Sequence, residues 1–127
     1  MSINPSAENY LETIYVLSRR MPGGVRAIDV ANELGFSKPS VSIGLKHLRD
    51  SGLSKTSEQG FVLLTEEGLS IAKSVYERHT VLTAWLTSLG VDKDTAMEDA
   101  CKIEHVISEQ SFEAVKRHII AQHHIDI

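Results

Sequence analysis

Residues 25–49 have the sequence VRAIDVANELGFSKPSVSIGLKHLR, and this stretch decides the fold. Its first part carries apolar residues at helical spacing up to Leu34, followed by Gly35, the residue type that commonly ends a helix. Ser37 is a good N-cap for a second helix, in which three apolar residues share one face: Val41, Leu45 and Leu48. Two short helices joined by a tight turn that contains glycine predict a helix-turn-helix, with the second helix as the recognition helix.

The residues on either side predict a winged form of this motif. Upstream, Asn4 and Pro5 form a helix start, and the apolar spacing predicts a helix over residues 5–20. Downstream, residues 53–56 and 61–64 flank a turn with a glycine and predict a β-hairpin, the wing. We therefore expect residues 1–64 to form a winged helix-turn-helix domain.

The second half of the chain carries helical patterns only. Thr65 is an N-cap, and an apolar stripe at steps of three and four residues then predicts one helix of more than twenty residues, ending before Gly90. Two more helices are expected, the first from Asp92 or Asp94 to about Ile107 and the second from Ser108 or Ser111 to about Gln122. Residues 65–127 are thus expected to form a helical domain, and the fold class is mainly α.

Composition and charge limit the classes of function. The chain has 127 residues, of which 42% are apolar and 24% charged, which is typical of a folded protein. The net charge of −4 by itself argues against a nucleic acid as partner, because phosphates attract basic surfaces. The acidic excess is confined to one half, however: residues 1–64 contain seven basic and six acidic residues, and residues 65–127 contain six and eleven. The charge therefore does not exclude DNA as a partner of the first half.

Cysteine content and hydropathy predict the compartment. Cys101 is the single cysteine, so no intrachain disulfide can form and a reducing compartment is favoured. No apolar run approaches the roughly 20 residues that a membrane helix needs. The start of the sequence, MSINPSAENY, does not have the pattern of a secretory signal. We expect a cytoplasmic protein that has no membrane partner.

Cys101, Glu104 and His105 form the strongest chemical cluster in the sequence. On a helix, residues three and four positions apart lie on one face, so a thiolate, a carboxylate and an imidazole would converge. Mixed sulfur, oxygen and nitrogen donors suit Fe²⁺, Mn²⁺, Zn²⁺ or Co²⁺ rather than Ca²⁺ or Mg²⁺. The alternative is a buried cysteine beside an exposed Glu–His pair.

His79 and Glu12 each allow two interpretations. His79 lies on the apolar stripe of the long helix, where it is either a core histidine or a metal ligand that points between helices. Glu12 lies at the edge of the apolar face of the first helix, where it is either a solvated carboxylate or a ligand. The spacing alone leaves both questions open.

The recognition helix supplies the candidate DNA contacts. Its serines, lysines and arginine are suited to phosphates, while its proline and isoleucine offer apolar surface to thymine methyl groups. The candidates are Ser37, Lys38, Pro39, Ser40, Ser42, Ile43, Lys46 and Arg49. Because winged helices also bind other proteins, a protein-interaction module is the alternative.

Several strings in order along nearly the whole chain resemble the diphtheria-toxin-repressor and manganese-transport-regulator family. These strings are ENYLETIY at 8–15, SKPSVS at 37–42, Leu64-Thr65, Arg78-His79 and CKIEHVIS at 101–108. The resemblance implies a winged helix-turn-helix, then a helical dimerisation domain, with divalent Fe or Mn as corepressor. We expect no counterpart of the SH3-like third domain of the longer members.

Carried over position by position, the resemblance implies a set of metal ligands. They are Glu12, His79, Cys101, Glu104 and His105, together with Asn9 at a position where one branch of the family has Asp and the other Met. A cysteine at 101 is typical of the iron-sensing branch and a glutamate at 12 of the manganese-sensing branch, so the chain is a hybrid. Thr83 and Met97 replace the ligands of the iron branch's ancillary site.

The expected function is a homodimeric, metal-dependent repressor that binds a palindromic operator in double-stranded DNA and controls metal-homeostasis genes. Mn²⁺ or Fe²⁺ is the expected cofactor, with Co²⁺ or Zn²⁺ as substitutes in vitro. One alternative is a metal-independent winged-helix regulator that responds to a small ligand or a protein partner. Another is a metallohydrolase with Glu104 as base, but five protein ligands would leave little open coordination for a substrate. We therefore expect that the chain is not an enzyme.

Overall fold

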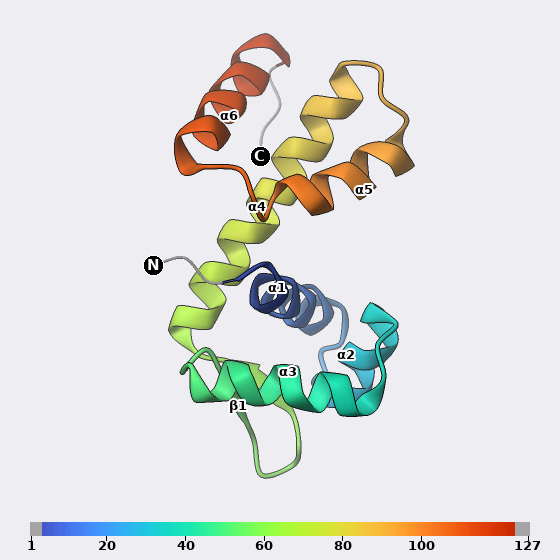
Figure 1. The fold of residues 1–127 in the computed structure, drawn as a ribbon, viewed down its shortest axis with the longest axis vertical. Coiled ribbons are helices and arrows are strands. Elements are labelled where there is room, and N and C mark those ends of the chain that lie inside the picture. Colours follow the sequence, from blue (N-terminus) through green and yellow to red (C-terminus); the bar gives the residue numbers. More distant parts are fainter. Residues whose placement is uncertain (1–3, 124–127) are drawn as a thin grey trace. The chain divides into compact units, whose positions relative to one another are not determined.

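The computed structural model describes residues 4–123, which form six helices and one two-stranded sheet (Figure 1). The elements are α1 (Pro5–Arg20), α2 (Ala27–Leu34), α3 (Lys38–Asp50), β1 (Ser54–Thr56), β2 (Val62–Leu64), α4 (Glu66–Ser88), α5 (Lys93–Ile103) and α6 (Glu109–His123). They divide into two compact units, Met1–Lys73 and Ser74–Ile127, here called the N-terminal and C-terminal units. The predicted fold class, mainly α with a winged helix-turn-helix, is confirmed.

The helix-turn-helix forms as its sequence predicts. Gly35 adopts a left-handed conformation (φ 71°) and its N–H donates to the carbonyl of Ala31, which ends α2. Ser37 caps α3 by accepting a hydrogen bond from the N–H of Ser40 at 3.3 Å. The three predicted core residues of α3 are buried against α1 and α2: Val41, Leu45 and Leu48. Apolar burial therefore fixes which face of α3 points outward.

The wing is a short antiparallel hairpin in which Ser54 of β1 pairs with Leu64 of β2. Its base is held by Val62, whose N–H donates to the carbonyl of Val25 at 2.7 Å. Its tip is held by Arg26, which donates to the carbonyl of Gln59 at 2.7 Å and lies over the ring of Phe61. Sequence patterns predict the hairpin but not this long-range tether.

The long helix α4 begins at the wing. The hydroxyl of Thr65 donates to the carbonyl of Gly52 at 2.8 Å and accepts from the N–H of Gly68 at 3.1 Å, so Thr65 is the predicted N-cap. Ala72 still belongs to the N-terminal core, and the boundary between the units follows Lys73. The sequence pattern predicts the boundary after Leu64 instead, where the wing ends.

The C-terminal unit contains the rest of α4 together with α5 and α6. Its core joins Val81 of α4 to Phe112 and Ile119 of α6. Asp92 caps α5 and Ser108 caps the start of α6, two of the four residues proposed for these roles. Among the described residues, no helix is long and apolar enough to cross a membrane.

The predicted end of α5 was wrong. The sequence suggested a helix to about Ile107, but α5 ends at Ile103 and residues 104–106 form a turn. The side chain of Arg78 binds the carbonyls of Glu104 and Ile107, at 3.3 and 3.1 Å. Arg78 thus donates to carbonyls that the N–H groups of a longer helix would otherwise bind. No local sequence signal indicates this contact, because Arg78 is distant in the sequence.

Gly68 provides a test of how tightly α4 is seated on the wing. A Cβ atom at this position would collide with the backbone carbonyl of Leu53, which cannot move without shifting β1. We predict that Gly68→Ala destabilises the protein by about 1–3 kcal/mol in urea denaturation, because of overpacking. Gly23→Ala is the matched control, since no atom lies within 4 Å of its added Cβ. Equal stability of the two variants would contradict the prediction.

Candidate functional site

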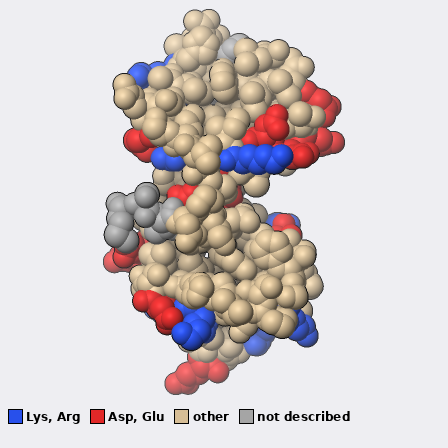
Figure 2. Space-filling view, viewed as in Figure 1, with Lys and Arg blue, Asp and Glu red and all other residues tan. Residues whose placement is uncertain are grey.

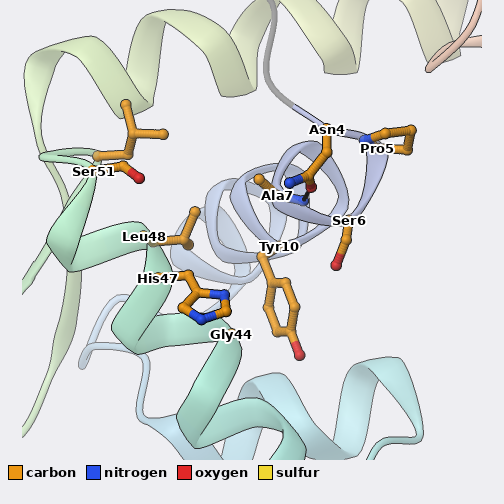
Figure 3. A pocket seen from close by; sticks show the side chains of 10 residues that line it. Asn4, Pro5, Ser6, Ala7, Tyr10, Gly44, His47, Leu48 and Ser51 are labelled. Carbon is orange, nitrogen blue, oxygen red and sulfur yellow. Dashed lines mark hydrogen bonds between the residues drawn. The ribbon is translucent and has the colours of Figure 1, made fainter.

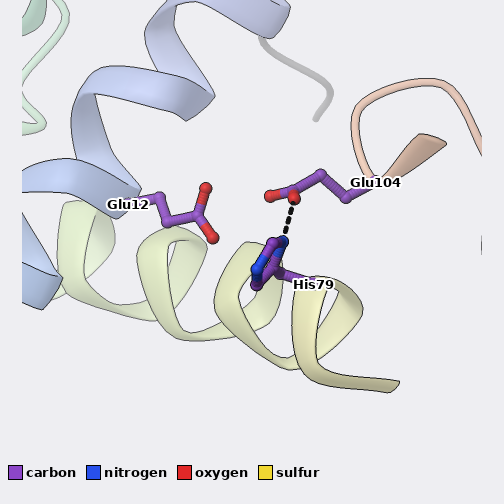
Figure 4. A group of neighbouring side chains, drawn as sticks. All are labelled: Glu12, His79 and Glu104. Atoms are coloured by element: carbon purple, nitrogen blue, oxygen red, sulfur yellow. Dashed lines mark hydrogen bonds and ion pairs between the residues drawn. The ribbon is translucent and has the colours of Figure 1, made fainter. Parts of the chain in front are cut away.

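His79 and Glu104 form an ion pair inside the C-terminal unit (Figure 4). His79 lies in the middle of α4, and Glu104 directly follows the end of α5. Their Nδ1 and Oε1 atoms are 2.9 Å apart. The Glu104 side chain is 0% exposed and that of His79 is 23% exposed. The two atoms are at hydrogen-bond distance, and a carboxylate in its ionised form would accept this bond from an Nδ1–H.

The second carboxylate oxygen of Glu104 lacks a hydrogen-bond partner among the described residues, although it is buried. Nε2 of His105 lies 3.9 Å from this oxygen, which is too long for a hydrogen bond. Two ligands that each lie roughly 2.0–2.2 Å from a common ion are separated by up to about 4 Å. A buried carboxylate with an unsatisfied oxygen near imidazole nitrogen therefore fits a divalent transition metal.

Cys101 differs from its two predicted partners. It lies on α5 and is exposed, whereas Glu104 is fully buried and the His105 side chain is 9% exposed. Because α5 ends at Ile103, the three side chains do not share one continuous helix. Glu104 still has right-handed helical dihedral angles and donates its N–H to Ala100. The assignment of Cys101 as a ligand stays a prediction.

Glu12 and Asn9 belong to α1 in the N-terminal unit. Glu12, also drawn in Figure 4, is 9% exposed and lies in the largely buried stretch of that helix. The interpretation of Glu12 as a solvated carboxylate is therefore wrong. Asn9 is half-buried. That either residue binds metal stays a prediction.

Thr83 and Met97, at the positions of the iron branch's ancillary site, are not the carboxylate and imidazole ligands of that site. Thr83 has a buried hydroxyl that makes no hydrogen bond to any described residue, and Met97 is 41% exposed. A hydroxyl and a thioether are weaker ligands for Fe²⁺ or Mn²⁺ than a carboxylate and an imidazole. The structure thus offers the stronger donors at His79, Glu104 and His105.

All the candidate DNA contacts on α3 are exposed: Ser37, Lys38, Pro39, Ser40, Ser42, Ile43, Lys46 and Arg49. Ile43 is the most notable, because an apolar side chain on this surface is 58% exposed. Lys46 forms an exposed ion pair with Asp50 at 2.9 Å, and its hydrogen bond lowers the pKa of Asp50. On the face drawn in Figure 2, basic and acidic side chains lie in small mixed groups.

A hollow beside α3 was not anticipated from the sequence. It is lined by the start of α1 and by one side of α3, with Tyr10 and His47 facing it (Figure 3). The Tyr10 hydroxyl donates to the carbonyl of Ser40 at 3.4 Å, and burial raises the pKa of Tyr10. Gly44 lets the Tyr10 ring lie against α3, because any Cβ there would overlap the ring. The hollow thus marks where α1 supports the recognition helix.

Two family models match the chain. Residues 2–62 match the iron dependent repressor, N-terminal DNA binding domain, and residues 65–120 match the iron dependent repressor, metal binding and dimerisation domain.

Similar proteins include the transcriptional regulator MntR of Escherichia coli O157:H7, which is 37% identical over 109 residues, 86% of this chain and 70% of MntR. An uncharacterized HTH-type transcriptional regulator of Methanocaldococcus jannaschii is 30% identical over 115 residues, 90% of this chain and 92% of the relative. Among solved structures, the manganese regulator SloR aligns with a TM-score of 0.80 and 30% identity over 94% of this chain. The chain spans about half of SloR, 54% of its length.

The variant Glu104→Gln separates the effect of the buried charge on stability from its effect on metal binding. The amide keeps the shape and can accept the His79 hydrogen bond, but it removes a charge that is expensive to bury. We predict that, with a chelator present, this variant melts at a temperature no lower than the wild type. Added Mn²⁺ should raise the melting temperature of the wild type, because an ion that binds the folded protein stabilises it. It should not raise the melting temperature of Glu104→Gln, which lacks the charged ligand.

Glu98→Gln is the control for this experiment, since Glu98 lies on α5 with its side chain 74% exposed. It should respond to Mn²⁺ like the wild type. A normal Mn²⁺ response of Glu104→Gln would remove Glu104 from the list of ligands.

Proposed function

The chain belongs to the iron-dependent repressor family, and we propose that it is a metal-dependent, DNA-binding transcriptional repressor that controls metal-homeostasis genes. Mn²⁺ or Fe²⁺ is the proposed corepressor, and Co²⁺ or Zn²⁺ would replace it in vitro. The observation that carries the proposal is the buried Glu104, whose second oxygen has no hydrogen-bond partner among the described residues. It occurs in a chain whose other unit presents an exposed recognition helix.

We assign His79, Glu104, His105 and Cys101 as ligands from the C-terminal unit, and Glu12 with Asn9 from the N-terminal unit. The donor chemistry of the C-terminal set supports this assignment, and for Glu12 and Asn9 the support is the sequence resemblance. When bound, a divalent ion supplies positive charge and a defined coordination geometry. Ligands drawn from both halves of the chain couple metal binding to the orientation of the DNA-binding half, which is a population shift of a few kcal/mol.

The proposed DNA target is a palindrome, bound by a homodimer through the exposed face of α3. Two recognition helices about 34 Å apart would match one turn of B-DNA. Dimerisation is assigned to residues 65–127, as the family model of this segment describes. Exposed apolar side chains of this segment support a partner surface, since Leu89 is 63% and Val106 78% exposed. Residues 1–64 are assigned to DNA binding.

We further propose that the protein acts in the cytoplasm and is not an enzyme. The relatives described above are named as transcriptional regulators. A catalytic zinc site needs an open coordination position, and the proposed ligand set is too large to leave one readily.

Metal-dependent DNA binding is the direct test. We predict that Mn²⁺ or Fe²⁺ raises affinity for palindromic DNA from the protein's own promoter, relative to chelator, by about 5–150-fold, the usual range of coupling between two sites. Glu12→Ala and His105→Ala should lose most of this increase, while Glu98→Gln should retain it. Fluorescence anisotropy with labelled DNA gives the affinities.

If affinity does not change with metal or with either substitution, the metal-independent winged-helix regulator replaces the proposal. Hydrolytic turnover that is lost in the same variants would instead indicate a metallohydrolase.

The exposed side chain of Ile43 leads us to expect a preference for thymine over uracil in the DNA target. If its exposed side chain contacts a thymine methyl group, replacement of that thymine by uracil removes the methyl contact alone. We predict that this replacement weakens wild-type binding by about fourfold, which corresponds to about 0.8 kcal/mol for one methylene-sized group. Ile43→Ala should be insensitive to the replacement.

Ile28→Ala is the control, since Ile28 is 40% exposed but lies on α2. It should retain the wild-type preference for thymine. A scan of all operator thymines that shows no difference between wild type and Ile43→Ala would contradict the contact.

A further inference from the structure

Arg78, the residue before His79 on α4, has a largely buried side chain with four partners. Nη1 donates to the carbonyl of Glu104 at 3.3 Å and to that of Ile107 at 3.1 Å. Nη2 donates to Oε2 of Glu109 at 2.8 Å, and the guanidinium lies 5.6 Å from the centre of the Phe112 ring. The side chain is only 17% exposed, so these contacts are its main environment.

The segment that Arg78 binds needs such a partner. Carbonyl groups at the C-terminal end of a helix have no N–H partner within that helix, so their hydrogen bonds must come from other donors. The turn after α5 contains both Glu104 and His105. A guanidinium has several N–H donors on separate nitrogens in one rigid plane, so it can bind two carbonyls and a carboxylate at fixed positions, whereas the donors of a lysine all radiate from one nitrogen atom on a flexible stem.

Glu104 is consequently held from two sides by neighbouring residues of α4. Arg78 binds its backbone carbonyl and His79 binds its carboxylate. Its backbone position and its side-chain direction are therefore both set by α4. Without the arginine, the backbone of Glu104 would keep only its N–H bond to Ala100, and His79 would remain the contact of the carboxylate.

We propose that Arg78 is a positioning residue that preorganises Glu104 and His105 for metal binding before any ion arrives. This inference rests on the proposed function, because it assumes that these residues are ligands. Groups that orient metal ligands without touching the metal commonly contribute a factor of 10–100 to metal affinity. Loss of Arg78 is therefore expected to lower the affinity for metal more than the stability of the fold.

A second ion pair between the same two helices provides a matched control. Lys116 of α6 binds Glu77 of α4 at 2.9 Å, and this hydrogen bond raises the pKa of Lys116. The Glu77 side of the pair lies one residue from Arg78 on α4, and the pair links α4 to α6 without involving the turn at 104–106. Lys116→Met thus removes an α4–α6 link of similar exposure and leaves the carbonyl contacts of Arg78 intact.

The experiment measures Mn²⁺ affinity and metal-free melting of Arg78→Lys, Glu109→Gln and Lys116→Met. Electron paramagnetic resonance of free Mn²⁺ gives the affinity without DNA. We expect about a 10–100-fold loss of affinity for Arg78→Lys alone. Glu109→Gln should stay near the wild type, because it removes the exposed carboxylate partner but leaves both carbonyl contacts. An affinity of Arg78→Lys equal to that of Lys116→Met would overturn the inference, as would an equal loss in Glu109→Gln.

Two further measurements keep the outcomes distinguishable. If His79→Ala and Glu104→Gln retain full Mn²⁺ affinity, the proposed function fails; if they lose it and Arg78→Lys does not, only the role of Arg78 fails. Hydrogen exchange of the metal-free wild type needs no variant. The backbone amides of Val106 and Ile107, which both donate to the carbonyl of Ile103 at 3.0 Å, should be protected like those of α5. Exchange at the rate of an unstructured chain would contradict preorganisation.

Discussion

The buried carboxylate of Glu104 is the constraint on which the C-terminal unit depends. An ionised carboxylate that leaves water costs several kcal/mol unless hydrogen bonds or charges replace its hydration. His79 satisfies one oxygen, and the other has no hydrogen-bond partner in the part of the chain that the structure describes. An apolar residue of similar size would avoid this cost. A stability cost of this kind is characteristic of positions retained for binding rather than for folding.

The surrounding elements are arranged so that this cost can be tolerated. α4 presents Arg78 and His79 in succession, and both contact Glu104. α5 ends at Ile103, the Glu104 carbonyl that follows accepts from the guanidinium, and the Ser108 cap starts α6 directly after the turn. The cation–π contact of the Arg78 guanidinium with the Phe112 ring adds a link from α6. One largely buried side chain of α4 thus contacts both the turn after α5 and the first turn of α6.

The sequence predicts what short-range interactions determine, and it fails where a distant partner decides. The helix-turn-helix, the turn of the wing and the start of α4 follow from local residues that each act within a few positions, namely Gly35, Ser37, Gly60 and Thr65. The end of α5 depends on an arginine 26 positions from Glu104, so local patterns placed it one turn too late. The site is predictable in part: spacing indicates the cluster at 101–105, but it cannot tell that Glu104 is buried while Cys101 is exposed.

The same geometry gives the net charge of −4 a physical meaning. The acidic excess lies in residues 65–127, the half that contains most of the proposed ligands, while residues 1–64 are close to neutral. Phosphate backbones repel acidic protein surfaces, and the repulsion decreases when bound cations neutralise them. On α3 the positive charge is sparse, because Asp50 already pairs with Lys46. With so little net positive charge on α3, affinity for DNA has to depend on the fit of this helix to DNA more than on charge.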